Sequence, residues 1–446
     1  MRRTVIGLPA VKNKCETLPE RYDNDVLNKQ SRSEWMRRKP LFPPPHHPTT
    51  GKRLENKGKQ PSSVLTINGE IKILRRWWHA KGVGSIALAD EIVNRNRDTV
   101  TPGVVEMASR VNLSATSFLR AAAALERTAQ VKMSGEQLRR LVEAAGRQVL
   151  KAQANDAIQV AWHASDCVVP EDETGQKTRV YTGCDGVMVP IITEAEKVKR
   201  RDTIKAKRRR SGKKCKPLPQ RKHGSDRAWK EFKVVFFYSE DAKHQHVAFT
   251  HGNHVKAGTL LRREADRLRF REAGERVGLV DGAVWIREQA ELHLAELDAL
   301  GLDFYHLSEN VHRARRKVFG EESPEGSAWA GELMHVFKHA GYAAAWEKIV
   351  QWRAALKGKT KREAADRLMN FVSQRKEMIR YPTFRERGWQ IGSGPTESQC
   401  KLCTKRLKGY GRRWDRPNAT AVAALDTLDR NGQWRQYWPN ACPAAV

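Results

Sequence analysis

The sequence contains no long apolar segment and few cysteines. None of its stretches approaches the roughly 18 to 20 apolar residues that a membrane-spanning helix needs. The apolar part of the opening segment, Val5–Leu8, is too short for a signal-peptide core. Seven cysteines in 446 residues are an odd and sparse number, which argues against the disulfide framework of a secreted domain. These absences predict a soluble, cytoplasmic protein with no membrane partner.

Acidic residues are too few to balance the basic ones. There are 82 lysines and arginines against 51 aspartates and glutamates, which gives a formal net charge of +31. Such an excess repels itself in a compact chain unless a polyanion neutralises it. Nucleic acid is the first candidate, because each phosphate contact releases counterions; an anionic membrane surface is second, and the lack of a spanning segment weakens it. Composition therefore predicts a nucleoid-associated, nucleic-acid-handling protein and leaves open whether it is an enzyme.

The length predicts two or three domains at about 150 residues each, and shifts in composition divide the chain further. The expected segments are a basic flexible arm (1–60), a DNA-binding region with helix-turn-helix-like helices (61–152), the first part of an α/β core (153–312), a helical insertion (313–389), the last helix of the core (390–435) and a tail (436–446).

The N-terminal third predicts an arm, a hairpin and three helices. The arm, 1–60, is rich in proline and charge and has almost no apolar periodicity. Val64–Trp78 predicts a hairpin with its turn at Asn68-Gly69. Helices are expected to begin at Pro102 and after Ser134, with another between them. Helix, short polar turn, helix is the outline of a helix-turn-helix unit; an ordinary helical hairpin fits the same pattern.

Strands and helices alternate from about residue 155 to residue 306. Strands are expected at 158–161, 179–184, 232–238, 245–250, 276–280 and 302–306, and a basic amphipathic helix at 259–273. The very basic run Lys197–Lys222 has few apolar residues and predicts an exposed loop. Residues 311–388 are almost wholly helical in pattern. A last helix is expected to start near Pro395, after Gly392-Ser393-Gly394.

Three acidic residues stand beside glycine or at a helix start. Asp185 follows a predicted strand, Asp281 follows another, and Glu397 falls in the first turn of the last helix. Carboxylates in such places are free to converge on a cation, and hard oxygen ligands suit Mg²⁺ or Mn²⁺. Two such ions could clamp the attacking and leaving oxygens of a phosphodiester. Each acid also has an ordinary interpretation, since Asp-Gly is a common turn and the helix dipole favours a first-turn Glu.

The segments around these acids resemble known signatures. Tyr181–Val187 (YTGCDGV) resembles the first-acid strand of DDE-class bacterial insertion-sequence transposases, and Val280–Ile286 (VDGAVWI) their second-acid signature, which Mutator-like transposases share. Trp229–Lys233 and Leu302–His306 resemble the strands that follow each. Most specific is Ile391–Ser398 (IGSGPTES), continued by a basic segment to Trp414, which is similar to the third-acid helix of the Kra-type group. The resemblance covers roughly residues 60–435.

This resemblance implies an RNase H-like mixed sheet flanked by helices, with an all-helical insertion between the second and third acids and an N-terminal helical region. It also implies two divalent ions, Mg²⁺ or Mn²⁺, held by the catalytic residues Asp185, Asp281 and Glu397. Water would attack first, and a freed DNA 3′-hydroxyl would then attack target DNA. The expected partner is double-stranded DNA, at the element's terminal repeats and the target. Joining two ends makes a homo-oligomer on DNA expected.

Basic residues near the third acid and in the basic run are expected to contact DNA phosphates. Lys401, Lys405 and Lys408 follow Glu397 at near-helical spacing. The other candidates are Arg412, Arg413, Lys207, Arg208, Arg209 and Arg210. A solvated cationic surface is the alternative interpretation of each group.

Other motifs point elsewhere or are missing. Cys400 and Cys403 have zinc-like spacing but no second pair nearby. Four histidines lie close together between His244 and His254 without an evident carboxylate or cysteine partner. Members of the Kra-type group often carry a cysteine-based zinc ribbon before the helix-turn-helix, and residues 64–100 contain no cysteine. Two alternatives stay open: a structure-selective nuclease on the same core, and a catalytically silent DNA-binding relic or repressor.

Overall fold

The computed structural model describes residues 45–47, 49–87, 99–170, 176–212 and 215–439. The chain divides into two compact units, one of residues 1–62 and 73–96 and the other of residues 63–72 and 97–446. Most of the predicted arm and most of the predicted tail lie outside the described residues. Within the described ranges, every helix is too short or too polar to cross a membrane.

The predicted hairpin belongs to a three-stranded sheet with the order β1-β2-β3. Its strands are β1 (Glu55–Thr66), β2 (Gly69–Ala80) and β3 (Gly84–Ile86). The Thr66 hydroxyl donates to the Gly69 carbonyl at 2.9 Å, and Gly69 has φ +100°, a value that favours glycine. The hairpin is longer than predicted, and β1 begins inside the range assigned to the arm.

Three helices follow, α3 (Pro102–Ser114), α4 (Phe118–Ala129) and α5 (Gly135–Ala154). Pro102 opens α3, and Ser134 caps α5 in a reciprocal pair with Gln137, as expected for these residue types. The Cβ that a side chain at Gly146 would carry lies 2.1 Å from the carbonyl oxygen of Ala421 on a C-terminal helix. The three helices therefore pack directly on the core, in the same compact unit as its sheet. Their DNA-binding role stays a prediction.

The core is a five-stranded mixed sheet with the order β6-β5-β4-β7-β8. Its strands are β4 (Arg179–Pro190), β5 (Trp229–Ser239), β6 (Gln245–Thr250), β7 (Glu275–Val280) and β8 (Ala299–Leu302). The β4–β5 and β5–β6 pairs are antiparallel, and the β4–β7 and β7–β8 pairs are parallel. This arrangement confirms the predicted mixed sheet and is consistent with an RNase H-like fold.

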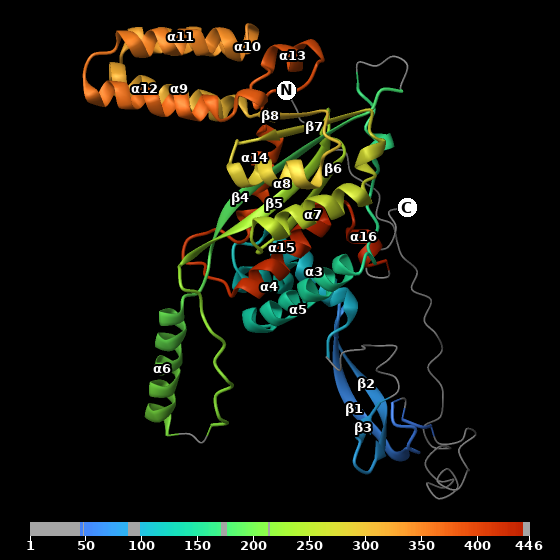
Figure 1. The fold of residues 1–446 in the computed structure, drawn as a ribbon. Coiled ribbons are helices and arrows are strands. Elements are labelled where there is room, and N and C mark those ends of the chain that lie inside the picture. Colours follow the sequence, from blue (N-terminus) through green and yellow to red (C-terminus); the bar gives the residue numbers. More distant parts are fainter. Residues whose placement is uncertain (1–44, 48, 88–98, 171–175, 213–214, 440–446) are drawn as a thin grey trace, which may run out of the picture. The chain divides into compact units, whose positions relative to one another are not determined.

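Helices cover both faces of this sheet (Figure 1). Alternate residues of β5 enter two separate cores: Phe232 and Phe236 face α14 and α15, whereas Val235 and Phe237 face α7. This alternation is the period of two that strands impose. The covering helices are α7 (His254–Arg267), α8 (Val284–His293), α14 (Gly394–Lys405), α15 (Arg416–Arg430) and the short α16 (Trp434–Tyr437). The sheet is therefore buried on both sides, which explains its continuous apolar strands.

The region between β8 and α14 is helical, as predicted. Its helices are α9 (Phe304–Phe319), α10 (Pro324–His339), α11 (Tyr342–Ala355), α12 (Lys359–Ser373) and α13 (Tyr381–Glu386). Trp329 and Trp352 stack with their ring centroids 4.1 Å apart, between α10 and α11. Both tryptophans are partly buried and pack against the apolar core of the bundle.

The basic run predicted to be a loop is largely a helix, α6 (Glu194–Ser211), and that prediction was wrong. Thr193 and Glu196 form a capping box at its start, and Gly212 ends it in the left-handed region. Lysine, arginine, alanine and glutamate are good helix formers, and no glycine or proline interrupts them. The apolar periodicity was missing because α6 has no buried residue, so it needs no apolar face.

Two short strand predictions were also wrong. Residues 158–161 form no strand; the Ile158 carbonyl instead accepts a hydrogen bond from the side chain of Arg267. The last strand ends at Leu302 rather than at His306, because Asp303 caps the following helix, α9. A third difference is that β4 continues to Pro190, so Asp185 lies inside a strand and not after one.

Candidate active site

Asp185 and Asp281 lie at equivalent distances beyond the pairing of two neighbouring parallel strands. The last paired residues of β4 and β7 are Thr182 and Gly278; Asp185 lies three residues further along β4, and Asp281 lies three residues further along the chain, directly after β7 ends. There β4 stays paired with β5, with Asp185 opposite Val234, while β7 ends at Val280. The sheet thus opens between β4 and β7 beyond Thr182 and Gly278, on the side of β4 where Asp281 follows the end of β7.

Asp185 is partly buried, and the charge of Asp281 acts on its carboxyl group. Burial raises the pKa of its carboxyl, and the negative charge of Asp281 raises that pKa further. Two neighbouring groups oppose this shift: the Gly186 N–H, which donates to Oδ1 of Asp185 at 2.6 Å, and the Cys400 thiol. A carboxylate whose charge is disfavoured by both burial and a neighbouring charge is suited to binding a cation.

Asp281 is oriented by the turn that follows it. The N–H of Ala283 donates to its Oδ1 at 2.8 Å, and Gly282 between them has φ +80°. Because that backbone conformation favours glycine, the Asp-Gly dipeptide has a local structural role here in addition to any chemical one. The Asp281-Gly282 pair therefore forms the turn predicted for it and also carries the carboxylate predicted to bind metal.

The third acid comes to the sheet on α14, and a glycine makes this possible. A Cβ added at Gly183 would lie 2.1 Å from Oγ1 of Thr396, so any larger residue would push α14 away from β4. Ser393 and Pro395 stand at the start of the helix as predicted, and Glu397 lies in its first turn. Cys400, one turn later, is the residue that contacts Asp185. The close approach of α14 to β4 therefore brings the third acid to the face of the sheet that carries the first.

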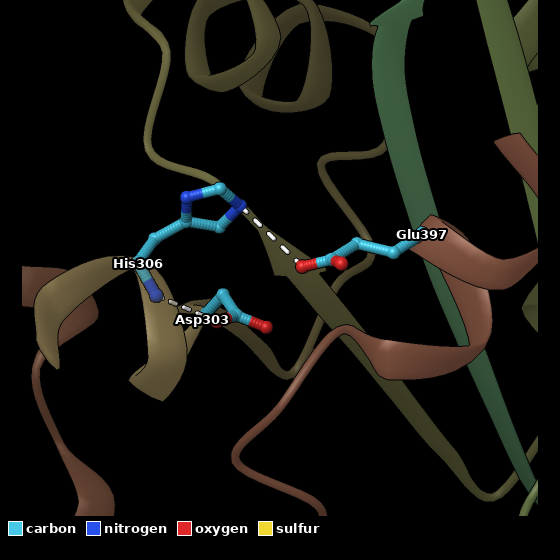
Figure 2. A group of neighbouring side chains, drawn as sticks. All are labelled: Asp303, His306 and Glu397. Carbon is cyan, nitrogen blue, oxygen red and sulfur yellow. Dashed lines mark hydrogen bonds and ion pairs between the residues drawn. The ribbon is translucent and has the colours of Figure 1, made fainter. Parts of the chain in front are cut away.

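Two residues of the β8–α9 junction complete the site (Figure 2). Nε2 of His306 lies 3.7 Å from Oε1 of Glu397, and single ligand atoms of Asp303, His306 and Glu397 all lie within 4.8 Å of one another. The positive charge that His306 can carry lowers the pKa of Asp185. His306 thus acts on the first acid and the third, between the two.

Asp303 holds this junction to the start of α14. It is fully buried, and its Oδ1 accepts the N–H of His306 at 2.9 Å, which caps α9. Its Oδ2 accepts the N–H of Ser393, the residue that precedes α14. The Phe304 N–H also donates to the Ile391 carbonyl at 2.9 Å. Since both Asp303 oxygens already accept backbone hydrogen bonds, we assign it a positioning role.

Asp303 and His306 were not among the site residues predicted from the sequence, because Leu302–His306 was expected to be a strand. The sequence did carry a signal for this, because an aspartate directly before a helical pattern is a typical helix N-cap. Of the predicted acids, the structure brings Asp185 and Asp281 side by side and links Glu397 to Asp185 through Cys400 and His306. The three acids do not form a cluster as tight as that of Glu397 with Asp303 and His306.

The basic residues after Glu397 divide into two groups. The ammonium of Lys401 lies 3.6 Å from Glu397 Oε2 with an 80% exposed side chain, and Lys405 and Lys408 are exposed. Arg412 instead donates to the carbonyls of residues 405, 406 and 408 and so closes the end of α14. Arg413 donates to the Ala228 carbonyl and approaches Glu196 at 3.5 Å. The three lysines are exposed, Lys401 beside Glu397, whereas the two arginines are held by backbone carbonyls.

The α6 arm, which we define as residues 194–212 and 215–228, presents the other predicted DNA contacts. Lys207, Arg209 and Arg210 are exposed on α6. Arg208 donates to the Lys216 carbonyl at 2.6 Å and Arg201 to the Pro219 carbonyl at 2.8 Å. These two arginines tie the returning chain to the helix. The α6 arm is thus held together by hydrogen bonds between the helix and the returning chain, and it presents a basic surface.

The remaining motifs have ordinary structural partners. Cys400 and Cys403 are both buried free thiols on α14. Burial raises the pKa of the Cys400 thiol far above its usual range, so it is protonated. His246 pairs with Glu264 at 2.9 Å, both buried, which supplies the carboxylate partner that the sequence did not reveal.

A scan against models of protein families finds no match, and a search of curated proteins finds none either. Among solved structures the chain is similar to the "Drosophila P element transposase strand transfer complex". That similarity covers 75% of this chain and 80% of the other, with 9% sequence identity and a TM-score of 0.25. It is a distant likeness.

The donor set at the sheet edge fits divalent cations that prefer oxygen. Asp185, Asp281 and Glu397 offer carboxylates from three separate segments of the chain, and burial, with the charge of Asp281 added, raises the pKa of Asp185. Hard carboxylate oxygens are the usual ligands of Mg²⁺ and Mn²⁺. His306 adds a nitrogen next to Glu397, a ligand type that Mn²⁺ accepts more readily than Mg²⁺.

Proposed function

We propose that the protein is a transposase of an insertion sequence, which binds the element's DNA ends and catalyses metal-dependent strand cleavage and strand transfer. The observation that carries this proposal is the arrangement of acids where the pairing of the central strands β4 and β7 ends. Asp185 on β4 and Asp281 directly after β7 both lie three residues beyond the last pairing of these parallel strands, and the glutamate-bearing helix α14 packs onto β4 at Gly183. The motif resemblance to the Kra-type group supports the finer assignment.

In this proposal Asp185, Asp281 and Glu397 hold two divalent ions, Mg²⁺ or Mn²⁺. Such ions stabilise the attacking and leaving oxygens of an in-line phosphoryl displacement. The chain's own residues prepare the carboxylates: the Gly186 N–H and the Cys400 thiol orient Asp185, and the Ala283 N–H orients Asp281. Charge and hydrogen bonding from such neighbours fix the ligands before substrate arrives.

His306 has a second task in the same site. Its Nε2 lies 3.7 Å from Glu397 and its Nδ1 lies 3.6 Å from Glu309, so Nε2 can hold Glu397 in place while Nδ1 faces Glu309. An imidazole there can also carry a proton during the displacement of an alkoxide. Its replacement is expected to weaken catalysis by roughly 10- to 100-fold, which is typical of residues that orient metal ligands.

Double-stranded DNA is the proposed partner, and its phosphates are the proposed ligands of the exposed lysines. Lys401, Lys405 and Lys408 continue α14 away from Glu397, so a duplex whose scissile phosphate lies at the acids can pass over them. The α6 arm offers a second cationic surface with no buried residue. Two DNA ends must be joined in one reaction, so we propose a homo-oligomer assembled on DNA.

The test is a strand-transfer assay with Mg²⁺ or Mn²⁺ on duplex DNA that carries the flanking sequences of the protein's own gene. Wild type is compared with Asp281→Asn, Glu397→Gln and the exposed control Glu288→Gln on α8. Joined products that vanish in the first two variants and persist in the control support the proposal. Cleavage without joining would instead indicate a structure-selective nuclease. Tight, salt-sensitive binding without chemistry would indicate a DNA-binding relic.

A further inference from the structure

The end of the helical insertion reaches the turn that carries the second acid. Arg375 follows the last turn of α12, and its Nε donates to the carbonyl of Gly282 at 2.9 Å. Its Nη1 donates to the Phe371 carbonyl at 3.0 Å, and the guanidinium lies over the Phe371 ring at 4.1 Å from the centroid. A residue of the insertion is thus fixed one position away from Asp281.

The fit around this contact is close. A Cβ at Gly282 would lie 2.6 Å from Nε of Arg375 and 2.7 Å from Cδ1 of Leu302. Arg287 on α8 fastens the same segment, because its Nη1 donates to the Gln374 carbonyl at 2.9 Å. Arg375 is therefore held in one place from both sides, unlike a surface arginine that moves freely.

The charges around Arg375 differ from those around an arginine that only connects two segments. Burial lowers the pKa of Arg375, the carboxylate of Asp281 opposes that shift, and the charge of Arg287 adds to it. Arginine nevertheless keeps its charge under such conditions. Nε and Nη1 are engaged with carbonyls, while Nη2 donates to no residue that the structure describes. The Nη2 group of Arg375 is therefore a fixed, positively charged donor close to Asp281.

We propose that Arg375 binds a non-bridging oxygen of the DNA phosphodiester at the acid site, which makes it a catalytic residue supplied by the insertion. This inference rests on the proposed function. As the attacking oxygen forms its bond to phosphorus and the bond to the leaving oxygen breaks, negative charge grows on the non-bridging oxygens. Nη2 donates to one of them and exchanges no proton. The electron pair of the broken bond departs with the leaving oxygen.

A fixed donor of this kind acts mainly in the transition state. Arg375→Gln should therefore lower the single-turnover rate of strand joining by about 10²- to 10³-fold, the usual effect of losing one such donor. Its dissociation constant for duplex DNA in Ca²⁺, measured by fluorescence anisotropy, should change little. Arg375→Lys should recover part of the rate, since it keeps the charge but cannot reach carbonyl and phosphate together.

Arg362→Gln is the matched control. Arg362 lies on the same helix, and its Nε also donates to a backbone carbonyl, that of Leu356 at 2.9 Å, but it stands near the other end of α12. Its rate should equal that of wild type. Unfolding midpoints of all variants are measured in parallel, so that a loss of folding is separated from a loss of chemistry.

A second measurement changes the substrate instead of the protein. With an uncharged methylphosphonate at the cleaved position, the charge that Nη2 contacts is absent, so Arg375→Gln should lower the single-turnover rate much less than it does with the natural duplex. An Arg375→Gln variant with the wild-type rate would overturn the inference, as would a rate that falls only in step with stability or affinity. If wild type itself joins no DNA, the proposed function fails and this inference falls with it. An active wild type beside an equally active variant removes the inference alone.

Discussion

The acid site and the α6 arm handle charge in opposite ways. At the acid site, the predicted carboxylates come from three segments far apart in the sequence, and burial together with Asp281 raises the pKa of Asp185. On α6, nine basic side chains follow one another in a single helix that buries no residue. The first region exists only because the sheet and α14 pack; the second follows from composition and capping. We therefore expect damage to the first to stop chemistry and damage to the second to weaken DNA binding.

The largest expected effect separates the two regions directly. Asp185→Asn should reduce strand cleavage and joining by 10³-fold or more, on the order of the loss of a catalytic group, because a neutral amide cannot replace a metal-binding carboxylate. Its affinity for duplex DNA should remain near that of wild type. Single-turnover assays and fluorescence anisotropy measure the two quantities. A variant that loses both together would show that the acid site and DNA binding are not separable.

The converse change removes positive charge from the α6 arm. Replacing Lys207, Arg209 and Arg210 with Gln should weaken duplex binding by about 10- to 100-fold at 150 mM salt and reduce the slope of log K against log salt by up to roughly 2.7. The unfolding midpoint should not change, since these residues are exposed. Arg208 is left in place because it holds the returning chain.

The control removes the same charge elsewhere. Lys357, Lys359 and Lys361, exposed near the start of α12, are replaced with Gln in a second variant. Its affinity should exceed that of the arm variant at every salt concentration. Equal losses in the two variants would mean that net charge alone, and not the arm, governs binding.

A smaller effect concerns the packing that builds the acid site. Gly183→Ala should destabilise the fold by about 1–3 kcal/mol, the usual range for overpacking, since the new Cβ would meet Thr396 at 2.1 Å. Thr396→Ala in the same chain should restore part of the loss; its Oγ1 is buried without a hydrogen-bond partner. Gly331→Ala on α10, where nothing lies within 4 Å, should stabilise by about 0.5–1 kcal/mol. Denaturant unfolding compares all three.

The smallest expected effect is a stability change of the opposite sign. Because the pKa of Asp185 is raised in the folded state, its ionised form costs stability above that pKa and costs nothing below the unfolded value of about 4. Asp185→Asn should therefore unfold a few degrees above wild type at pH 7 in the absence of metal, and the gap should close below about pH 4. Added Mg²⁺ or Mn²⁺ should raise the midpoint of wild type only. A variant less stable than wild type at pH 7 would contradict this account.

Much of the fold could be predicted from the sequence, because its elements carry local signals. The apolar strands at 232–238 and 276–280, the helical insertion and the start of α14 at Pro395 all follow from periodicity and capping. The loop predicted for the basic run failed for a physical reason: apolar periodicity detects helices that pack, and α6 does not pack. The segment 302–306 failed because one residue, Asp303, ends the strand and caps the next helix.

The sequence by itself determined the three acids and the excess of positive charge, since acids beside glycine or at a helix start and clustered lysines are visible without a fold. Only the tertiary structure decided which groups meet. Parallel pairing of β4 and β7 places Asp185 level with Asp281, the missing side chain at Gly183 admits α14, and Asp303 fastens His306 next to Glu397. The reason is that these contacts join residues some 90 or more positions apart, and such distances are set by sheet register and close packing and not by any local pattern.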